Sequence, residues 1–109
     1  MATSYKVLGQ SAPSATSATT LYTVPSATEA VISTIVVCNR AASAATYRIS
    51  VRPDGASQAN QHYIAYDATV SANDSTALTL GITLNAADVI TVYASTADLS
   101  FNAFGSEIV

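Results

Sequence analysis

The residues that most often carry out chemistry in proteins are scarce in this chain and lie far apart. It holds a single histidine, His62, and a single cysteine, Cys38. Nucleophilic catalysis needs a nucleophile held by a base and by a third, orienting group. No such set surrounds His62 in the sequence, so we interpret it as a surface or packing residue. Cys38 follows Ile35–Val37 and is expected to be a buried thiol that behaves as a small hydrophobic residue.

The carboxylates are equally dispersed. A zinc site needs clustered cysteine and histidine, and a calcium site needs several oxygen ligands in one loop. The acidic residues instead occur singly, at Glu29, Asp54, Asp67, Asp74, Asp88, Asp98 and Glu107. Four of them, Asp54, Asp74, Asp88 and Asp98, fall in or beside expected turns, where an Asp side chain commonly accepts hydrogen bonds from nearby backbone N–H groups. We therefore expect no catalytic, cofactor-binding or metal-binding residues, and an enzyme is the least favoured class.

The composition excludes several other classes. Of 109 residues only 10% are charged, and the formal net charge is −3 with four basic residues, which argues against nucleic-acid binding through phosphate neutralisation. The longest strongly apolar run, residues 35–38, is far short of the about 20 residues of a membrane-spanning helix. The start of the chain lacks the basic patch and apolar run of a secretory signal. One cysteine forms no internal disulfide, which fits a reducing cytoplasm.

The apolar residues alternate with polar ones along most of the chain, as in strands with one buried face. Tyr47, Ile49 and Val51 are a clear example, with Arg48 and Arg52 on the opposite face. Residues 31–38 are rich in β-branched residues and suit a central strand covered on both faces. Further strands are expected near residues 5–8, 21–24, 62–70, 77–84, 90–93 and 99–108. Turn residues separate them, and the alanine-rich segment 41–45 is interpreted as a hairpin loop.

About eight strands with regularly spaced turns predict an all-β fold, an antiparallel β-sandwich of the Ig-like or jelly-roll kind. Residues 10–20 are polar, small and without periodicity, which is typical of an extended tether. We therefore divide the chain into an N-terminal strand and flexible arm, residues 1–20, and a sandwich domain, residues 21–109. The strand at residues 5–8 either folds back onto its own sheet or adds to the sheet edge of another subunit.

The expected surface is dominated by small residues. Ala, Ser and Thr together make up about 45% of the chain. Such a surface loses little side-chain entropy when it is covered. A monomer that relies on charge for solubility would carry more charged residues. We infer an oligomer with much of its surface buried, and the candidate interface residues are Tyr5, Lys6, Val7, Leu8, Arg48 and Arg52.

Six tyrosines are the remaining enrichment. Tyrosine combines a large apolar ring with a polar tip and suits interfaces and sugar-stacking surfaces. Tyr63, Tyr66 and Tyr93 are therefore candidate stacking platforms of a carbohydrate-binding or host-surface-binding module. Tyr63 and Tyr66 are three residues apart, which predicts opposite faces of one strand.

Several segments resemble small structural proteins of tailed bacteriophages, particularly cyanophages. They are residues 5–10, 20–25, 33–40, 47–53, 62–67 and 99–107, and they span nearly the whole chain. The resemblance implies a β-sandwich virion component without enzymatic activity, assembled in the bacterial host cytoplasm. Its partners would be the major capsid protein or tail proteins, with no nucleic acid or membrane. A capsid decoration (cement) protein is the first expectation, and a tail, neck, baseplate or fibre-attachment component is the alternative.

Overall fold

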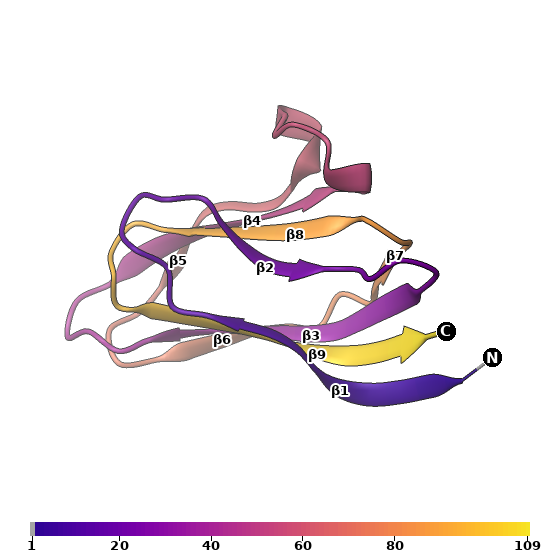
Figure 1. Ribbon diagram of the computed structural model, residues 1–109. Coiled ribbons are helices and arrows are strands. Elements are labelled where there is room, and N and C mark those ends of the chain that lie inside the picture. The colour runs from indigo at the N-terminus through magenta and orange to yellow at the C-terminus, as the bar shows by residue number, and fades with distance from the viewer. Residues whose placement is uncertain (1) are drawn as a thin grey trace.

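The computed structural model describes residues 2–109 and consists of two antiparallel sheets packed face to face (Figure 1). The nine strands are β1 (Thr3–Ser11), β2 (Thr19–Thr23), β3 (Glu29–Asn39), β4 (Ala45–Arg52), β5 (Tyr63–Val70), β6 (Ser75–Leu78), β7 (Ile82–Leu84), β8 (Val89–Ala94) and β9 (Leu99–Ile108). Two short 3-10 helices, η1 (Pro53–Gly55) and η2 (Asn60–His62), lie between β4 and β5. The predicted antiparallel β-sandwich is confirmed.

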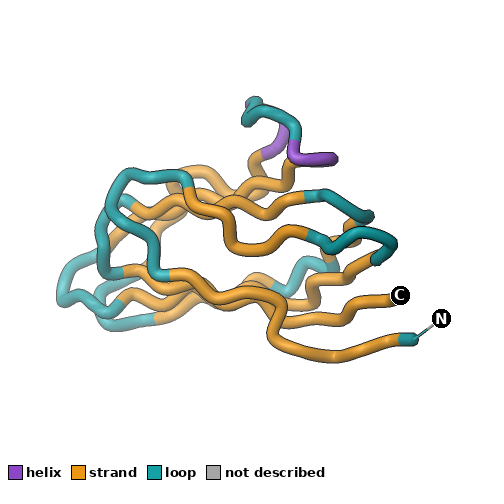
Figure 2. The backbone as a smooth tube through the Cα atoms, in the orientation of Figure 1, coloured by secondary structure: helices purple, strands orange, loops and turns teal. Residues whose placement is uncertain are grey.

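One sheet has the strand order β1-β9-β3-β6, with β7 also pairing with β3, and the other has the order β2-β8-β4-β5. Most loops lie at the two ends of the sandwich, as the tube trace shows (Figure 2). The segment that contains η1 and η2 instead projects from the sheet of β4 and β5 (Figure 1). Both termini lie at the same end, where the backbones of Ala2 and Val109 exchange two hydrogen bonds.

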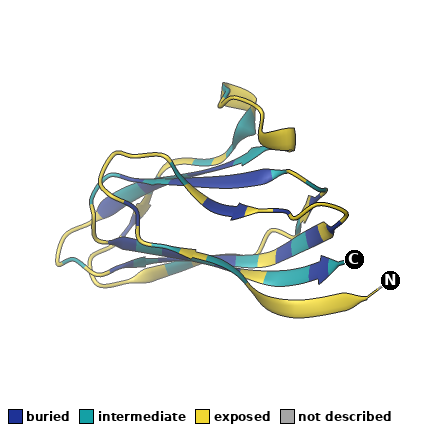
Figure 3. Ribbon diagram, in the orientation of Figure 1, coloured by how far each residue is buried: buried dark blue, intermediate teal, exposed yellow. Residues whose placement is uncertain are grey.

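The core lies between the sheets and is formed by the alternating apolar residues of both (Figure 3). Ile35 and Val37 of β3 and Ile90 and Val92 of β8 are fully buried in it. Tyr47 of β4 meets Phe101 of β9 edge to face, with ring centroids 6.2 Å apart, so this pair joins the two sheets. The period-two pattern therefore identified the inward face of these strands correctly.

Some expected elements differ from the structure because of single backbone positions. The strand expected near residues 77–84 is interrupted: β6 and β7 are separate, and Leu80 is exposed beside Gly81, whose φ is +63°. Glycine adopts this conformation at no steric cost, which allows the chain to turn out of the sheet. Segment 41–45 is not a hairpin loop, because it connects β3 in one sheet with β4 in the other.

The outer face of β3 also differs from the expectation. β3 is central, between β9 and β6, but its outward residues are only half-buried. Cys38 is one of them, so the prediction of a core thiol was wrong. Inner and outer positions alternate along β3, and Val37 occupies the inner one while Cys38 occupies the outer one. The apolar run around Cys38 therefore does not reflect burial on both faces.

The N-terminal segment pairs with its own chain. β1 is longer than expected, and it is antiparallel to β9 from Thr3 to Ser11. Gln10 and Ser11 thus belong to β1, while Thr19 and Thr20 belong to β2, so the connecting tether is residues 12–18. In this single chain the segment pairs with its own sheet, through β9.

Candidate functional site

The free side of β1 is the most regular exposed strand edge in the molecule. β1 ends its sheet, and its first half is exposed (Figure 3). The other edge strands are short, as in β2, β6 and β7, or interrupted by register shifts, as in β5. Such features protect a sheet edge from pairing with another chain. The register of β1 with β9 shifts once, between Val7 and Gly9, and it is uninterrupted from Thr3 to Val7.

The hydrogen-bond pattern shows which backbone groups β1 presents outward. Ala2 and Val109 form a doubly hydrogen-bonded pair, with N···O distances of 3.0 and 2.9 Å. In an antiparallel ladder such pairs alternate with pairs whose N–H and C=O groups point away from each other. Counting along the register, Thr3, Tyr5 and Val7 direct their backbone N–H and C=O groups to the free side. We call these three residues the β1 edge.

Apolar side chains accompany the β1 edge. Tyr5 is 85% exposed and Val7 is 48% exposed. Val7 lies opposite Phe104 of β9, which is 38% exposed and on the same outer face. Of the four expected interface residues in this strand, Tyr5 and Val7 therefore belong to one apolar patch with Phe104. Leu8 is half-buried and packs against the core.

Lys6 points to the inner face, into a polar cluster that fastens β1 and β9 to β2. Its Nζ lies 2.6 Å from Oε1 of Glu107, and the hydroxyl of Tyr22 donates a hydrogen bond of 2.5 Å to Oε2. Glu107 is buried. The Lys6 ammonium, and next the Tyr22 hydroxyl, lower the pKa of Glu107 below its ordinary value. Burial and the hydrogen bond to Glu107 raise the pKa of Tyr22 well above its ordinary value.

Glu107→Gln tests this cluster. At neutral pH we expect the variant to be less stable by about 1.5–3 kcal/mol, the range for hydrogen bonds to a charged group. The Glu107 carboxylate stabilises the fold fully above its ordinary pKa, and that contribution is lost as pH falls through the lowered folded-state pKa. The stability gap between wild type and variant should therefore narrow on acidification. Urea denaturation at several pH values measures it, and a gap that is constant from pH about 7 to about 3 would contradict this role.

Arg48, on the outer face of the other sheet, is enclosed by aromatic rings. Its guanidinium carbon lies 4.2 Å from the ring centroid of Tyr66 and 4.4 Å from that of Tyr93. Its Nε donates a hydrogen bond of 2.7 Å to Asp67, and this bond raises the pKa of the guanidinium. The second nitrogen, Nη2, lies 3.4 Å from the other carboxylate oxygen. Arg48 is thus held within the chain by charge and by cation–π contact.

Tyr63 and Tyr66 lie together, so the prediction of opposite faces was wrong. Their ring centroids are 4.9 Å apart at an interplanar angle of 80°. Two register shifts in β5 change the alternation: Ile64 is an extra residue, and both Tyr66 and Asp67 lie opposite Arg48. Asp67 has a positive φ of 52°. Such bulges re-aim side chains and cannot be read from period-two spacing.

Arg52, the other expected interface arginine, holds the projecting segment. Its Nε donates a hydrogen bond to the Thr91 hydroxyl at 3.1 Å, and Nη1 donates to the Ala56 carbonyl at 2.8 Å. His62 serves the same segment, because its Nδ1 accepts a hydrogen bond from the Ala59 N–H at 3.1 Å. Both side chains position residues 53–62 above β4 and β8.

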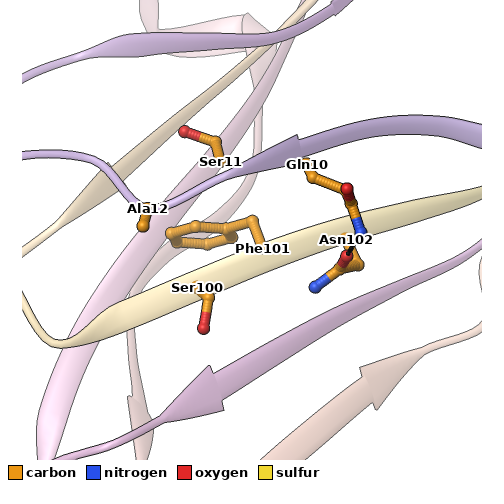
Figure 4. A pocket seen from close by; sticks show the side chains of 6 residues that line it. All are labelled: Gln10, Ser11, Ala12, Ser100, Phe101 and Asn102. Carbon is orange, nitrogen blue, oxygen red and sulfur yellow. Dashed lines mark hydrogen bonds between the residues drawn. The ribbon is translucent and has the colours of Figure 1, made fainter.

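Two surface hollows lie beside residues discussed above, within the part of the chain that the structure describes. The first, about 270 Å³, is lined by Asn60, Tyr63 and Tyr66. The second, about 320 Å³, lies where β1 ends beside the start of β9 (Figure 4). There the Gln10 amide donates a hydrogen bond of 2.7 Å to Asn102 on the outer face. The two amides are hydrogen-bonded to each other, and we assign no ligand to this hollow.

Among residues 2–109, no group of three or more His, Cys, Asp and Glu residues is arranged to hold a metal ion. No helix in this described part is long and apolar enough to cross a membrane. The turn carboxylates act partly as expected. Asp74 accepts a hydrogen bond from the Ser75 N–H, and Asp88 accepts bonds from Asn85 and Asp54.

Comparisons with known proteins identify no relative: no family model matches the sequence, and no curated protein or solved structure is significantly similar to the chain. The fold and surface define the class, an all-β sandwich with an exposed strand edge and a separate aromatic cluster. Residue spacing singled out Tyr5, Val7, Arg48 and the tyrosines. It missed Glu107, Asp67 and Asn60, which become significant only through contacts between distant segments.

Proposed function

We propose that this protein is a non-enzymatic structural subunit of a bacteriophage virion that acts through contacts between subunits. The observation that carries the proposal is the β1 edge, a regular row of unpaired backbone groups next to the apolar patch of Tyr5, Val7 and Phe104. Exposed strand edges are templates for strand addition, and exposed apolar patches mark interaction surfaces. The resemblance of several segments to small structural proteins of tailed phages supports the same role.

The partner at the β1 edge is a second copy of the chain. Two antiparallel β1 strands related by a two-fold axis are self-complementary, because each presents the same backbone groups to the other. Lys6 points to the inner face, where Glu107 compensates its charge. The Lys6 side chains of the two subunits therefore do not repel each other across the edge. The resulting dimer would extend the sheet of β1, β9, β3 and β6 across both subunits.

Within the virion we favour capsid decoration, because a small subunit with a weakly charged surface is suited to covering a repetitive shell. A tail, neck or baseplate position is the alternative. The test is electron microscopy of intact particles of the encoding phage, labelled with gold-conjugated antibody against the chain. We expect label on the head. Label on the tail would select the alternative, and absence of the chain from purified particles would overturn the virion assignment.

A further inference from the structure

A second surface lies far from β1, on the outer face of β4, β5 and β8. Here Tyr63, Tyr66 and Tyr93 gather beside Arg48, and we call these four residues the tyrosine cluster. The two bulges of β5 bring Tyr63 and Tyr66 to one side of the strand, and the backbone of Asp67 adopts a positive φ in the same place. Backbone irregularities of this kind are often found next to functional sites.

The positive charge of Arg48 in this cluster is already paired within the chain. Asp67 binds two nitrogens of the Arg48 guanidinium, and the rings of Tyr66 and Tyr93 lie over it. Arg48 therefore orients the rings and does not present a free cation to a ligand. The cluster therefore favours an uncharged ligand.

The hollow of Asn60, Tyr63 and Tyr66 is not explained by the packing of Arg48. The cation–π contacts of Arg48 are made by Tyr66 and Tyr93 and not by Tyr63 or Asn60, and Tyr66 remains 57% exposed. The two rings meet at 80° and form two walls, while the exposed Asn60 amide lies at the third side. Among residues 2–109 the Asn60 amide and the Tyr63 and Tyr66 hydroxyls have no side-chain hydrogen-bond partner.

We propose that this hollow binds a neutral hexopyranose unit of a glycan. The apolar C–H face of a sugar ring packs on an aromatic ring, and its hydroxyls exchange hydrogen bonds with an amide and with phenolic groups. Small-molecule sites combine aromatic walls with a few polar groups in this way. The hollow holds one ring and is open to solvent, so the affinity for a single sugar is in the millimolar range.

NMR titration of the ¹⁵N-labelled protein tests the proposal with methyl glycosides of glucose, galactose, mannose and N-acetylglucosamine. At least one sugar should cause saturable shifts of the backbone signals of Asn60, Tyr63 and Tyr66. Tyr63→Ala and Asn60→Ala should each weaken binding at least about tenfold. Tyr5→Ala removes a more exposed tyrosine on the other sheet and should bind as wild type does.

No saturable shift with any of these sugars would overturn the proposal, as would undiminished binding by folded Tyr63→Ala. N-acetylneuraminic acid is titrated in parallel as an acidic sugar. Binding of this sugar alone would overturn the neutral-sugar assignment. Because the hollow and the β1 edge lie on different sheets, the titration has no bearing on subunit pairing. Failure of one proposal therefore leaves the other intact.

Discussion

Gly9→Ala is expected to lower the free energy of unfolding by at least about 3 kcal/mol, the upper end for overpacking. A Cβ at this position would overlap the backbone carbonyl oxygen of Leu21, because β1 and β2 approach each other closely there. Gly9 is paired with Ala103 of β9, so making room for the Cβ requires β1 to shift away from β2 and strains this pairing. Urea denaturation of the variant, with hydrogen exchange of the β1 amides, measures both effects.

Ser4→Ala is the matched control for Gly9→Ala. Ser4 is exposed on the same strand, and its replacement should change stability by no more than about 0.5 kcal/mol. If Gly9→Ala were as stable as Ser4→Ala, the close approach of β1 to β2 would be refuted.

Asn39→Ala should have the second large effect, a loss of about 2–4 kcal/mol. Asn39 is almost fully buried at the end of β3. The two N–H groups of its Nδ2 are shared among the carbonyls of Ser43 at 2.8 Å, Ser71 at 3.2 Å and Val70 at 3.3 Å, and its Oδ1 accepts a hydrogen bond from the Ala41 N–H. One side chain thus connects the end of β3 with the end of β5 and with the loop before β4.

Two further variants separate hydrogen bonding from packing at this position. Asn39→Asp keeps the shape but turns an oxygen toward three carbonyls, so it should be at least as unstable as Asn39→Ala at neutral pH and recover partly in acid. Asn102→Ala removes an amide on the outer face and should cost no more than about 1 kcal/mol. Chemical denaturation measures the loss in free energy of unfolding for each variant. Equal losses for Asn39→Ala and Asn102→Ala would contradict the claim that the buried Asn39 side chain connects these segments.

Much of the fold follows from local pattern. Alternation at Tyr47, Ile49 and Val51 and the run from Leu99 to Ile108 marked β4 and β9 because period-two burial is a local property. The bulges in β5 escaped prediction because an inserted residue changes which face each later side chain occupies, and only the partner strand reveals it. The turn at Gly81 was also missed, because the alternation of apolar and polar residues continues unbroken from β6 into β7.

The candidate site was predictable only in its residue types. Exposed tyrosines and an apolar N-terminal strand are visible in the sequence, which is why Tyr5 and Val7 were expected at an interface. Glu107 could not be distinguished from any other isolated carboxylate in the sequence. Its partners Lys6 and Tyr22 lie near the other end of the sequence and meet it only in the folded chain. Arg48 was expected at an interface, yet its charge is satisfied within the chain by Asp67.

Sedimentation velocity of the wild type and of Tyr5→Pro tests the central claim most directly. Proline at position 5 removes an N–H that points to the free side of β1, so the hydrogen bonds between β1 and β9 stay intact. Tyr5→Ala keeps that N–H and removes only the aromatic ring. We predict that the wild type sediments as a dimer or larger, and Tyr5→Pro as a folded monomer of 11.2 kDa. Tyr5→Ala should still associate, though more weakly. A wild type that remains a monomer throughout the micromolar range, or a Tyr5→Pro variant that associates as wild type does, would contradict pairing through the β1 edge.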